Sequence, residues 1–143
     1  MDVSRYLERI NYTGDLSPTW EVLSKLQRSH LLNVPFENLD IHHHVKIDLV
    51  DSFNKIVNRK RGGFCYELNG LFYQLLKKLD FRVKLVSARV FDEEKGYGPE
   101  FDHMAIMVTI QPHDYLADVG FGEFTFEPLK IELDTEQLDS RGV

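Results

Sequence analysis

Residues 61–79 read RGGFCYELNGLFYQLLKKL, and this stretch decides the fold of the first half of the chain. From residue 64 onward the apolar side chains recur every three or four positions, at Phe64, Leu68, Leu71, Phe72, Leu75, Leu76 and Leu79. This spacing predicts a helix of about four turns with one apolar face. Gly62 and Gly63 precede the helix and permit a tight entry with a close backbone approach. The sequence therefore places Cys65 in the first turn of a well-packed helix.

The chain before this stretch also reads as helical. Residues 4–11 form a short amphipathic segment, and apolar positions within residues 20–32 recur at helical spacing. Ser17 followed by Pro18 predicts the start of the second helix, because serine is a favoured N-cap and proline is tolerated at the first helical position. Pro35 ends this helix, since the residue before a proline is driven out of the helical region.

The segment between Pro35 and Arg61 is less regular. Residues 36–47 (FENLDIHHHVKI) read as an extended link in which a short strand can form. Either Asp48 or Asp51 then caps a further helix. The apolar positions of that helix are Phe53, Ile56 and Val57.

The hydrophobic period changes after residue 80. Residues 81–91 (FRVKLVSARVF) alternate apolar and polar side chains, which predicts a half-buried strand. Residues 92–100 (DEEKGYGPE) predict a charged loop punctuated by glycine and proline. Residues 103–110 and 115–119 predict two further strands, and the short link QPHD between them favours a hairpin.

The end of the chain adds little to this pattern. Gly120, Phe121 and Gly122 break the third strand, and the polar tail from Leu129 contains no closing element. The expected fold class is α+β. A helical domain over residues 1–80 carries the cysteine, and a domain of antiparallel strands over residues 81–143 follows it.

Composition narrows the classes of function. The 143 residues include 17 Lys and Arg against 23 Asp and Glu, a net charge of −6, with 43% hydrophobic residues. This is typical of a folded globular chain, and an acidic balance argues against nucleic acid as a partner. No apolar run approaches the roughly 20 residues of a membrane span, and MDVSRYLERI has no signal-peptide core. The single cysteine cannot form an internal disulfide, so we expect a cytoplasmic protein with a reduced thiol.

Three residues can carry nucleophilic chemistry. Unpaired N–H groups at a helix start stabilise a thiolate, although Cys65 could equally be a small buried apolar residue. His103 opens a strand and could serve as its base. Asp118, late in an apolar strand, is either a turn former or the residue that orients the imidazole. The expected hairpin could bring His103 and Asp118 side by side.

Other polar clusters have ordinary explanations. His42, His43 and His44 could bind a metal, but no carboxylate or cysteine cluster completes a site, so an exposed loop is expected. An ionic cluster could form among three further residues, although such side chains are mostly exposed and unpaired. These three are Arg9, Glu37 and Arg61. The glycines of GYGPE and GFG match neither a phosphate-binding loop nor a dinucleotide fingerprint.

The motifs together resemble the arylamine N-acetyltransferase family. The resemblance rests on RGGFCYE at residues 61–67, VPFENL at residues 34–39, His103 opening HMAIMV, and Asp118 in LADVGFG. It extends from the N-terminus to about Pro128. The order and spacing of Cys65, His103 and Asp118 also fit the catalytic triad of that family.

The resemblance implies a two-step acetyl transfer. Cys65 would take the acetyl group of acetyl-CoA as a thioester, His103 would act as base and then acid, and Asp118 would orient the imidazole. An arylamine or hydrazine would then accept the acetyl group, with no metal involved. Phe36 and Phe121 match positions that line the acceptor pocket in the family. The resemblance also implies ion pairs near the helix that carries the nucleophile. The residues at the matching positions are Arg9, Glu37 and Arg61.

The family also implies an architecture. Its members place a β-barrel-like domain after the helical one, in a core related to papain-like and transglutaminase-like thiol enzymes. They add a third, α/β domain that covers the site, and they run to about twice this length. We therefore expect this chain to lack the covering domain. An unclosed sheet leaves edges exposed, which predicts self-association or partial unfolding. Two other outcomes stay open: a thioester hydrolase with the same triad, in which water reaches the acyl-enzyme, and an inactive remnant.

Overall fold

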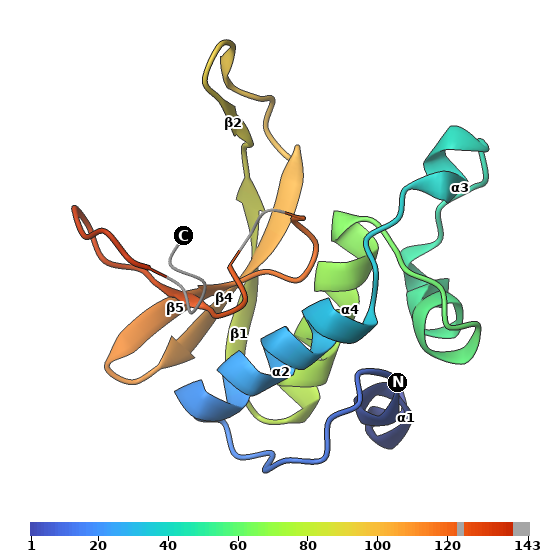
Figure 1. The fold of residues 1–143 in the computed structure, drawn as a ribbon, viewed down its shortest axis with the longest axis horizontal. Helices are drawn as coiled ribbons and strands as arrows, with labels where there is room; N and C mark the ends of the chain where they lie inside the picture. Colours follow the sequence, from blue (N-terminus) through green and yellow to red (C-terminus); the bar gives the residue numbers. More distant parts are fainter. Residues whose placement is uncertain (123–124, 139–143) are drawn as a thin grey trace.

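A computed structural model of the chain describes residues 1–122 and 125–138. The long helix α4 packs on an antiparallel sheet, a second long helix, α2, lies beside α4, and a short hairpin extends from one end of the sheet (Figure 1). The α+β class with an antiparallel sheet is therefore confirmed. The last residues of the expected second domain, 139–143, lie outside the described residues.

The first two helices begin at side-chain caps. The carboxylate of Asp2 accepts the Arg5 N–H at the start of α1 (Val3–Arg9), and the Thr19 hydroxyl accepts the Val22 N–H at the start of α2 (Trp20–Asn33). The prediction that α2 begins at Ser17-Pro18 was wrong by two residues. Thr19 is itself extended, with φ −110° and ψ 164°, so the helix cannot include the residues before it.

The segment after Pro35 is more helical than predicted. Phe36 forms an isolated parallel bridge with Gly63, and a short helix, α3 (Leu39–His42), follows it. The N–H groups of Ile41 and His42 donate to the Asn38 carbonyl, which turns the expected link into a helix.

Two further turns connect α3 to the central helix. Asp48 caps η1 (Leu49–Asp51) by accepting the Val50 N–H at 2.9 Å, as one of the two predicted caps. A π-helical turn, η2 (Asn54–Asn58), follows and buries Ile56 and Val57. The predicted helix here is thus two short turns rather than one regular element.

The central helix, α4 (Cys65–Lys78), confirms the prediction from residues 61–79. Its apolar face is fully or almost fully buried at Leu68, Leu71, Phe72, Leu75 and Leu76. It packs on β1 and β4 of the sheet. On its other side the Phe72 ring meets the His30 ring of α2, with 5.6 Å between ring centroids. The core therefore lies between α2, α4 and the sheet.

The sheet has the order β1-β4-β5-β6, and all neighbours are antiparallel. Its strands are β1 (Arg82–Ala88), β4 (His103–Ile110), β5 (His113–Ala117) and β6 (Leu129–Lys130). The predicted strand over residues 103–110 and its hairpin are confirmed, but the next strand runs from His113 to Ala117 rather than over residues 115–119, because His113 and Asp114 of the expected link already pair with β4. The tail does add a strand, β6, which the polar composition did not predict, because its backbone pairs with β5 at only two positions.

The predicted loop over residues 92–100 contains all of a small hairpin except its first residue, Phe91. Strands β2 (Phe91–Asp92) and β3 (Gly96–Tyr97) pair there, and Gly96 has φ +74°, a backbone conformation that favours glycine. The rings of Phe91 and Tyr97 meet edge to face across the hairpin.

The sheet is open among the described residues. Strands β1 and β6 each pair on one side only, so the sheet has two edges and no barrel is closed. The barrel-like and papain-like description of the second half therefore stays a prediction, as does the division into domains at residue 80.

Candidate active site

Cys65 is the first residue of α4, and its position is fixed by a tight backbone approach. A Cβ on Gly62 would lie 2.0 Å from the Pro35 carbonyl oxygen, so only glycine fits there. Phe64, the residue before the helix, is extended, and the carboxylate of Glu67 accepts its N–H at 3.1 Å. Cys65 itself is half-buried. The thiol thus sits where a helix start favours a negative charge.

His103 and Asp118 come together at one end of the sheet. His103 begins β4, and Asp118 directly follows β5, which runs antiparallel beside it. Nε2 of His103 lies 2.5 Å from Oδ2 of Asp118, and the two residues are only 6% and 2% exposed. The hairpin therefore places the imidazole and the carboxylate side by side in a buried setting.

The imidazole of His103 connects Asp118 to Cys65. Because Nε2 faces Asp118, Nδ1 is the nitrogen left for the thiol. Burial alone lowers the pKa of His103, but its hydrogen bonds with Asp118 and Cys65, and the charges of both, outweigh that effect and raise the pKa from 6.5 to about 9. At neutral pH the ring is therefore protonated and carries a positive charge beside the sulfur.

Asp118 acts both as a turn former and as a partner for specific side chains. Its Oδ1 accepts the N–H of Gly120 at 2.8 Å, which shapes the turn after β5. The same oxygen accepts a hydrogen bond from Nδ2 of Asn69, also at 2.8 Å. Asp118 thus both shapes the turn and contacts His103, while its role as the residue that orients the imidazole stays a prediction.

Two buried amide side chains hold Asp118, one through its carboxylate and one through its backbone N–H, and neither was predicted. Asn69, one turn after Cys65 on α4, also donates to the Met104 carbonyl at 2.7 Å and accepts the Val119 N–H at 2.9 Å. Gln27 of α2 accepts the Asp118 N–H at 3.3 Å. Both amide residues are fully buried. A polar residue on an otherwise apolar helix face is the signal that could have identified them.

The turn after Asp118 brings backbone against the thiol-bearing residue. A Cβ on Gly120 would lie 2.7 Å from the Cα of Cys65 and 2.9 Å from Nδ2 of Asn69. Such a contact leaves no room for a side chain, so glycine is required by packing at this position.

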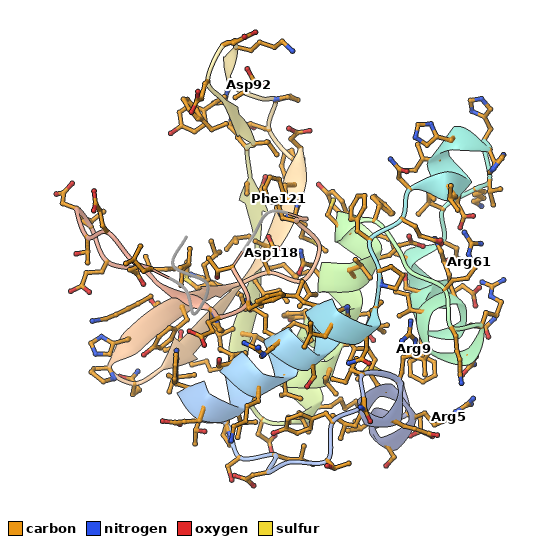
Figure 2. All side chains as sticks on the ribbon, in the orientation of Figure 1. Arg5, Arg9, Arg61, Asp92, Asp118 and Phe121 are labelled. Carbon is orange, nitrogen blue, oxygen red and sulfur yellow. The ribbon has the colours of Figure 1, made fainter. Side chains whose placement is uncertain are left out.

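The two candidate substrate-binding rings line a hollow beside the site. Figure 2 shows Asp118 and Phe121 on the sheet side of α4. The Phe121 ring stands edge to face against the His103 ring, with 5.3 Å between centroids. Phe36 and Phe121 together line an apolar hollow of about 290 Å³. A second hollow of about 320 Å³ includes His103, Asp118 and Phe121 in its lining. Phe121 therefore separates two apolar spaces.

The expected ionic cluster is assembled only in part. Arg61 contacts Glu37 at 2.6 Å and Asp40 at 2.8 Å. Arg9 donates instead to backbone carbonyls, those of Ile56, Asn33 and Arg61. Arg9 and Arg61 lie on the far side of α4 from Asp118 (Figure 2). Arg9 thus ties three segments of backbone together, while Arg61 pairs with the carboxylates.

The remaining candidates are peripheral. His42, His43 and His44 are exposed at the end of α3. In the part of the chain that the structure describes, no three His, Cys, Asp or Glu side chains are grouped to hold a metal ion. None of the helices in that same part combines the length and the apolar character that crossing a membrane requires.

The comparisons with known proteins agree on one family. A family model described as N-acetyltransferase matches residues 19–143. The chain is 35% identical to the chicken (Gallus gallus) arylamine N-acetyltransferase pineal gland isozyme NAT-3, an alignment covering 100% of this chain and 51% of the relative. It is 32% identical to the arylamine N-acetyltransferase of Escherichia coli, over 98% of this chain and 51% of that protein.

Solved structures give the same result. The arylamine N-acetyltransferase of Mycobacterium marinum superimposes with a TM-score of 0.89 at 37% identity, over 96% of this chain and 54% of that one. The same enzyme in complex with CoA gives a TM-score of 0.87 at 38% identity, over 95% and 53%. This chain belongs to the arylamine N-acetyltransferase family, as its motifs predicted, and it spans about half the length of the relatives it matches.

Proposed function

We propose that this chain carries the catalytic residues for acetyl transfer from acetyl-CoA to the nitrogen of an arylamine or hydrazine. The observation that carries the proposal is the buried pairing of His103 with Asp118, with Cys65 at a helix start on the other side of the imidazole. Membership of the family supports the reaction type. The relative solved in complex with CoA supports acetyl-CoA as the donor.

The first step loads the enzyme. The Cys65 thiolate attacks the carbonyl carbon of acetyl-CoA, and the backbone N–H groups at the start of α4 lie nearby as hydrogen-bond donors. The bond from that carbon to the CoA sulfur breaks as the new bond to Sγ forms. His103, protonated at neutral pH, gives its proton to the departing CoA thiolate. Cys65 is left as an acetyl thioester and the imidazole is left neutral.

The second step transfers the acetyl group. The amine nitrogen of the acceptor attacks the thioester carbon, and neutral His103 removes the proton that the nitrogen must lose. The bond to Sγ breaks and Cys65 leaves as a thiolate, so the thiolate and imidazolium pair is restored. Asp118 stabilises the imidazolium and holds the ring in one orientation throughout.

The acceptor is proposed to bind in the hollow lined by Phe36 and Phe121. Two aromatic rings suit a flat aromatic amine, because offset and edge-to-face ring contacts are favourable. The hollow is open, and Phe36 is 51% exposed. Arg9, Glu37 and Arg61 are proposed to stabilise the backbone around α4 rather than to touch the substrate. A cytoplasmic location, consistent with a reduced Cys65, stays a prediction.

The proposal is tested by following free CoA during incubation with acetyl-CoA, with and without an arylamine such as an aniline. Without the amine we expect at most one CoA released per enzyme, from the loading step, whereas with the amine we expect continuing CoA release and acetylated amine in equal amount. Equal release without the amine would instead indicate a thioester hydrolase. No release, together with no acetyl adduct on Cys65, would indicate a remnant that does not use this donor.

A further inference from the structure

A buried lysine contacts the first turn of the helix that carries the nucleophile. Lys55, in the π-helical turn η2, is only 4% exposed. Its Nζ lies 2.9 Å and 3.1 Å from the two carboxylate oxygens of Glu67 and 2.8 Å from Oδ2 of Asp40. Lysine is almost never this buried unless it is paired. The contacts explain its burial and connect η2 to α4.

The carboxylate that Lys55 holds fixes the first turn of α4. Glu67 is 3% exposed, and its Oε2 accepts the N–H of Phe64 at 3.1 Å. Its own N–H donates to the Phe64 carbonyl at 3.0 Å. Glu67 therefore clamps the residue immediately before Cys65, and Lys55 holds Glu67 through the same oxygen.

The charge of Glu67 would oppose catalysis if it were not neutralised. A carboxylate two residues from Cys65 repels a thiolate, and a buried position strengthens that repulsion. Burial lowers the pKa of Lys55, but hydrogen bonds with Asp40 and Glu67 outweigh it and raise the pKa above its ordinary value. Lys55 thus stays positive at neutral pH and can cancel the charge of Glu67.

The charged groups around the start of α4 form two sets. On the sheet side are His103 and Asp118, which contact each other. On the opposite side three carboxylates face two cations, and the members of this set are Glu37, Asp40, Glu67, Lys55 and Arg61. Without Lys55, the second set would hold three negative charges against one positive charge.

We propose that Lys55 is a positioning residue for Cys65, because it neutralises Glu67 and lets that carboxylate clamp the helix start without repelling the thiolate. The inference rests on the proposed function only in taking Cys65 as the nucleophile. It assigns a role to a residue that touches neither the proposed substrate hollows nor the His103–Asp118 pair. A buried ion pair is weak support for stability by itself, which is a reason to seek its role at the thiolate.

The test is a double-mutant cycle read out at the thiol. Wild type, Lys55→Met, Glu67→Gln and the double variant are alkylated with iodoacetamide from about pH 5 to about pH 9, and the pH of half-maximal rate is recorded. Glutamine keeps an oxygen for the Phe64 N–H, whereas methionine removes the cation at similar volume. Arg59→Met is the matched control, since Arg59 and Asp51 form a neighbouring but exposed pair at 3.0 Å.

The expected shift of the alkylation midpoint depends on whether the Glu67 carboxylate is present. Lys55→Met raises the midpoint by on the order of one pH unit, because Glu67 is then unneutralised. In the Glu67→Gln background the same substitution leaves the midpoint within experimental error of wild type, and Arg59→Met also leaves it unchanged. Because removing both partners of a buried ion pair can also restore folding, urea unfolding of the same variants separates the two roles: a purely structural role would lower the unfolding free energy of Lys55→Met and leave its alkylation midpoint unchanged.

Each contrary result has a definite meaning. A wild-type midpoint like that of a free thiol would overturn the proposed function of Cys65. A low wild-type midpoint that Lys55→Met leaves unchanged would overturn only the role of Lys55. If Lys55→Met alone does not fold, the double variant decides: a folded double variant with a raised midpoint would contradict the proposal, and one with the wild-type midpoint would support it.

Discussion

At the scale of single residues, the protonation of His103 links Asp118 to the reactivity of Cys65. Asp118 approaches Nε2 to 2.5 Å, and the hydrogen bonds of Asp118 and Cys65 raise the pKa of His103 to about 9 despite burial. A protonated imidazole beside the thiol favours the thiolate, which is the nucleophilic form. The carboxylate thus acts on the sulfur through the ring between them.

We expect Asp118→Asn to slow alkylation of Cys65 by about tenfold or more at pH 7, because the imidazolium loses its charge partner. The measurement is the rate of iodoacetamide labelling followed by mass spectrometry. Asp114→Asn is the control, since Asp114 lies in β5, the strand that leads to Asp118, but is exposed. Equal rates in wild type and Asp118→Asn would contradict a role for Asp118 beside His103.

The raised pKa of His103 also predicts how stability depends on pH. Between its unfolded value near 6.5 and its folded value of about 9, the folded protein holds a proton that the unfolded chain has lost. The stabilisation from His103 is therefore complete below pH 6.5 and is lost as the pH rises toward 9.

Urea unfolding of Cys65→Ser and of Cys65→Ser combined with His103→Gln, at several pH values, measures this effect. The serine background is needed because in wild type a proton lost by Cys65 would offset the proton that His103 gains. We expect the difference in unfolding free energy to shrink by up to about 1.4 kcal/mol per pH unit across that window. A difference that stays constant from about pH 6 to about pH 9 would show that His103 does not retain the extra proton in the folded state.

At the scale of elements, the turn after β5 must pass directly against the start of α4. Gly120 is the contact point, because a Cβ there would lie 2.7 Å from the Cα of Cys65. Asn69 reinforces the same junction through hydrogen bonds to Asp118 and Val119. The relative position of helix and sheet at the site therefore depends on one glycine and one amide.

Gly120→Ala should separate these elements and destabilise the protein by about 1–3 kcal/mol, since the added methyl meets backbone rather than a flexible side chain. Gly122→Ala is a matched control, because a Cβ on Gly122 meets nothing within 4 Å. Thermal unfolding of both variants, with Cys65 alkylation rates, gives the comparison. Equal unfolding temperatures for the two variants would contradict the packing argument.

Local sequence patterns predicted the elements with the strongest periodicity. The apolar spacing of residues 64–79 predicted α4, and the pattern over residues 103–110 predicted β4 with its observed bounds. The start of α2 was misplaced because both Ser17 and Thr19 can cap a helix, and only the backbone conformation of Thr19 decides between them. The strand β6 was missed because it is short and defined by pairing rather than by composition.

The residues of the candidate site were predictable where a local motif marks them. Cys65, His103 and Asp118 stand out through motif and position, whereas Asn69 and Gln27 act through contacts 49 and 91 residues away in sequence. No local pattern encodes such distances. The pairing of Lys55 with Glu67 was missed for a related reason, since a lysine that follows Asn54 reads as exposed until its partner is known.

At the scale of the whole molecule, the sheet is open within residues 1–122 and 125–138, and its edge strands there present backbone groups that no neighbouring strand pairs. Strand β1 pairs with β4 on one side only, and Leu85 within it is 44% exposed. An unpaired edge with apolar side chains is a template for pairing with another chain. We propose that this protein self-associates through the β1 edge.

Size-exclusion chromatography over a range of concentrations tests this proposal. Wild type should elute earlier as its concentration rises, and Leu85→Lys should reduce the shift, because a charge on an edge strand disfavours pairing. Val50→Lys is the control, since Val50 is 92% exposed but lies in η1, away from the sheet. A monomer at every concentration would contradict self-association.

The central claim is that Cys65, assisted by His103 and Asp118, accepts an acetyl group from acetyl-CoA. The most direct measurement is the intact mass of the protein after brief incubation with acetyl-CoA, beside a Cys65→Ser control. We predict the mass of one acetyl group added to wild type and none added to the control. A folded wild-type protein that gains no acetyl group would contradict the claim.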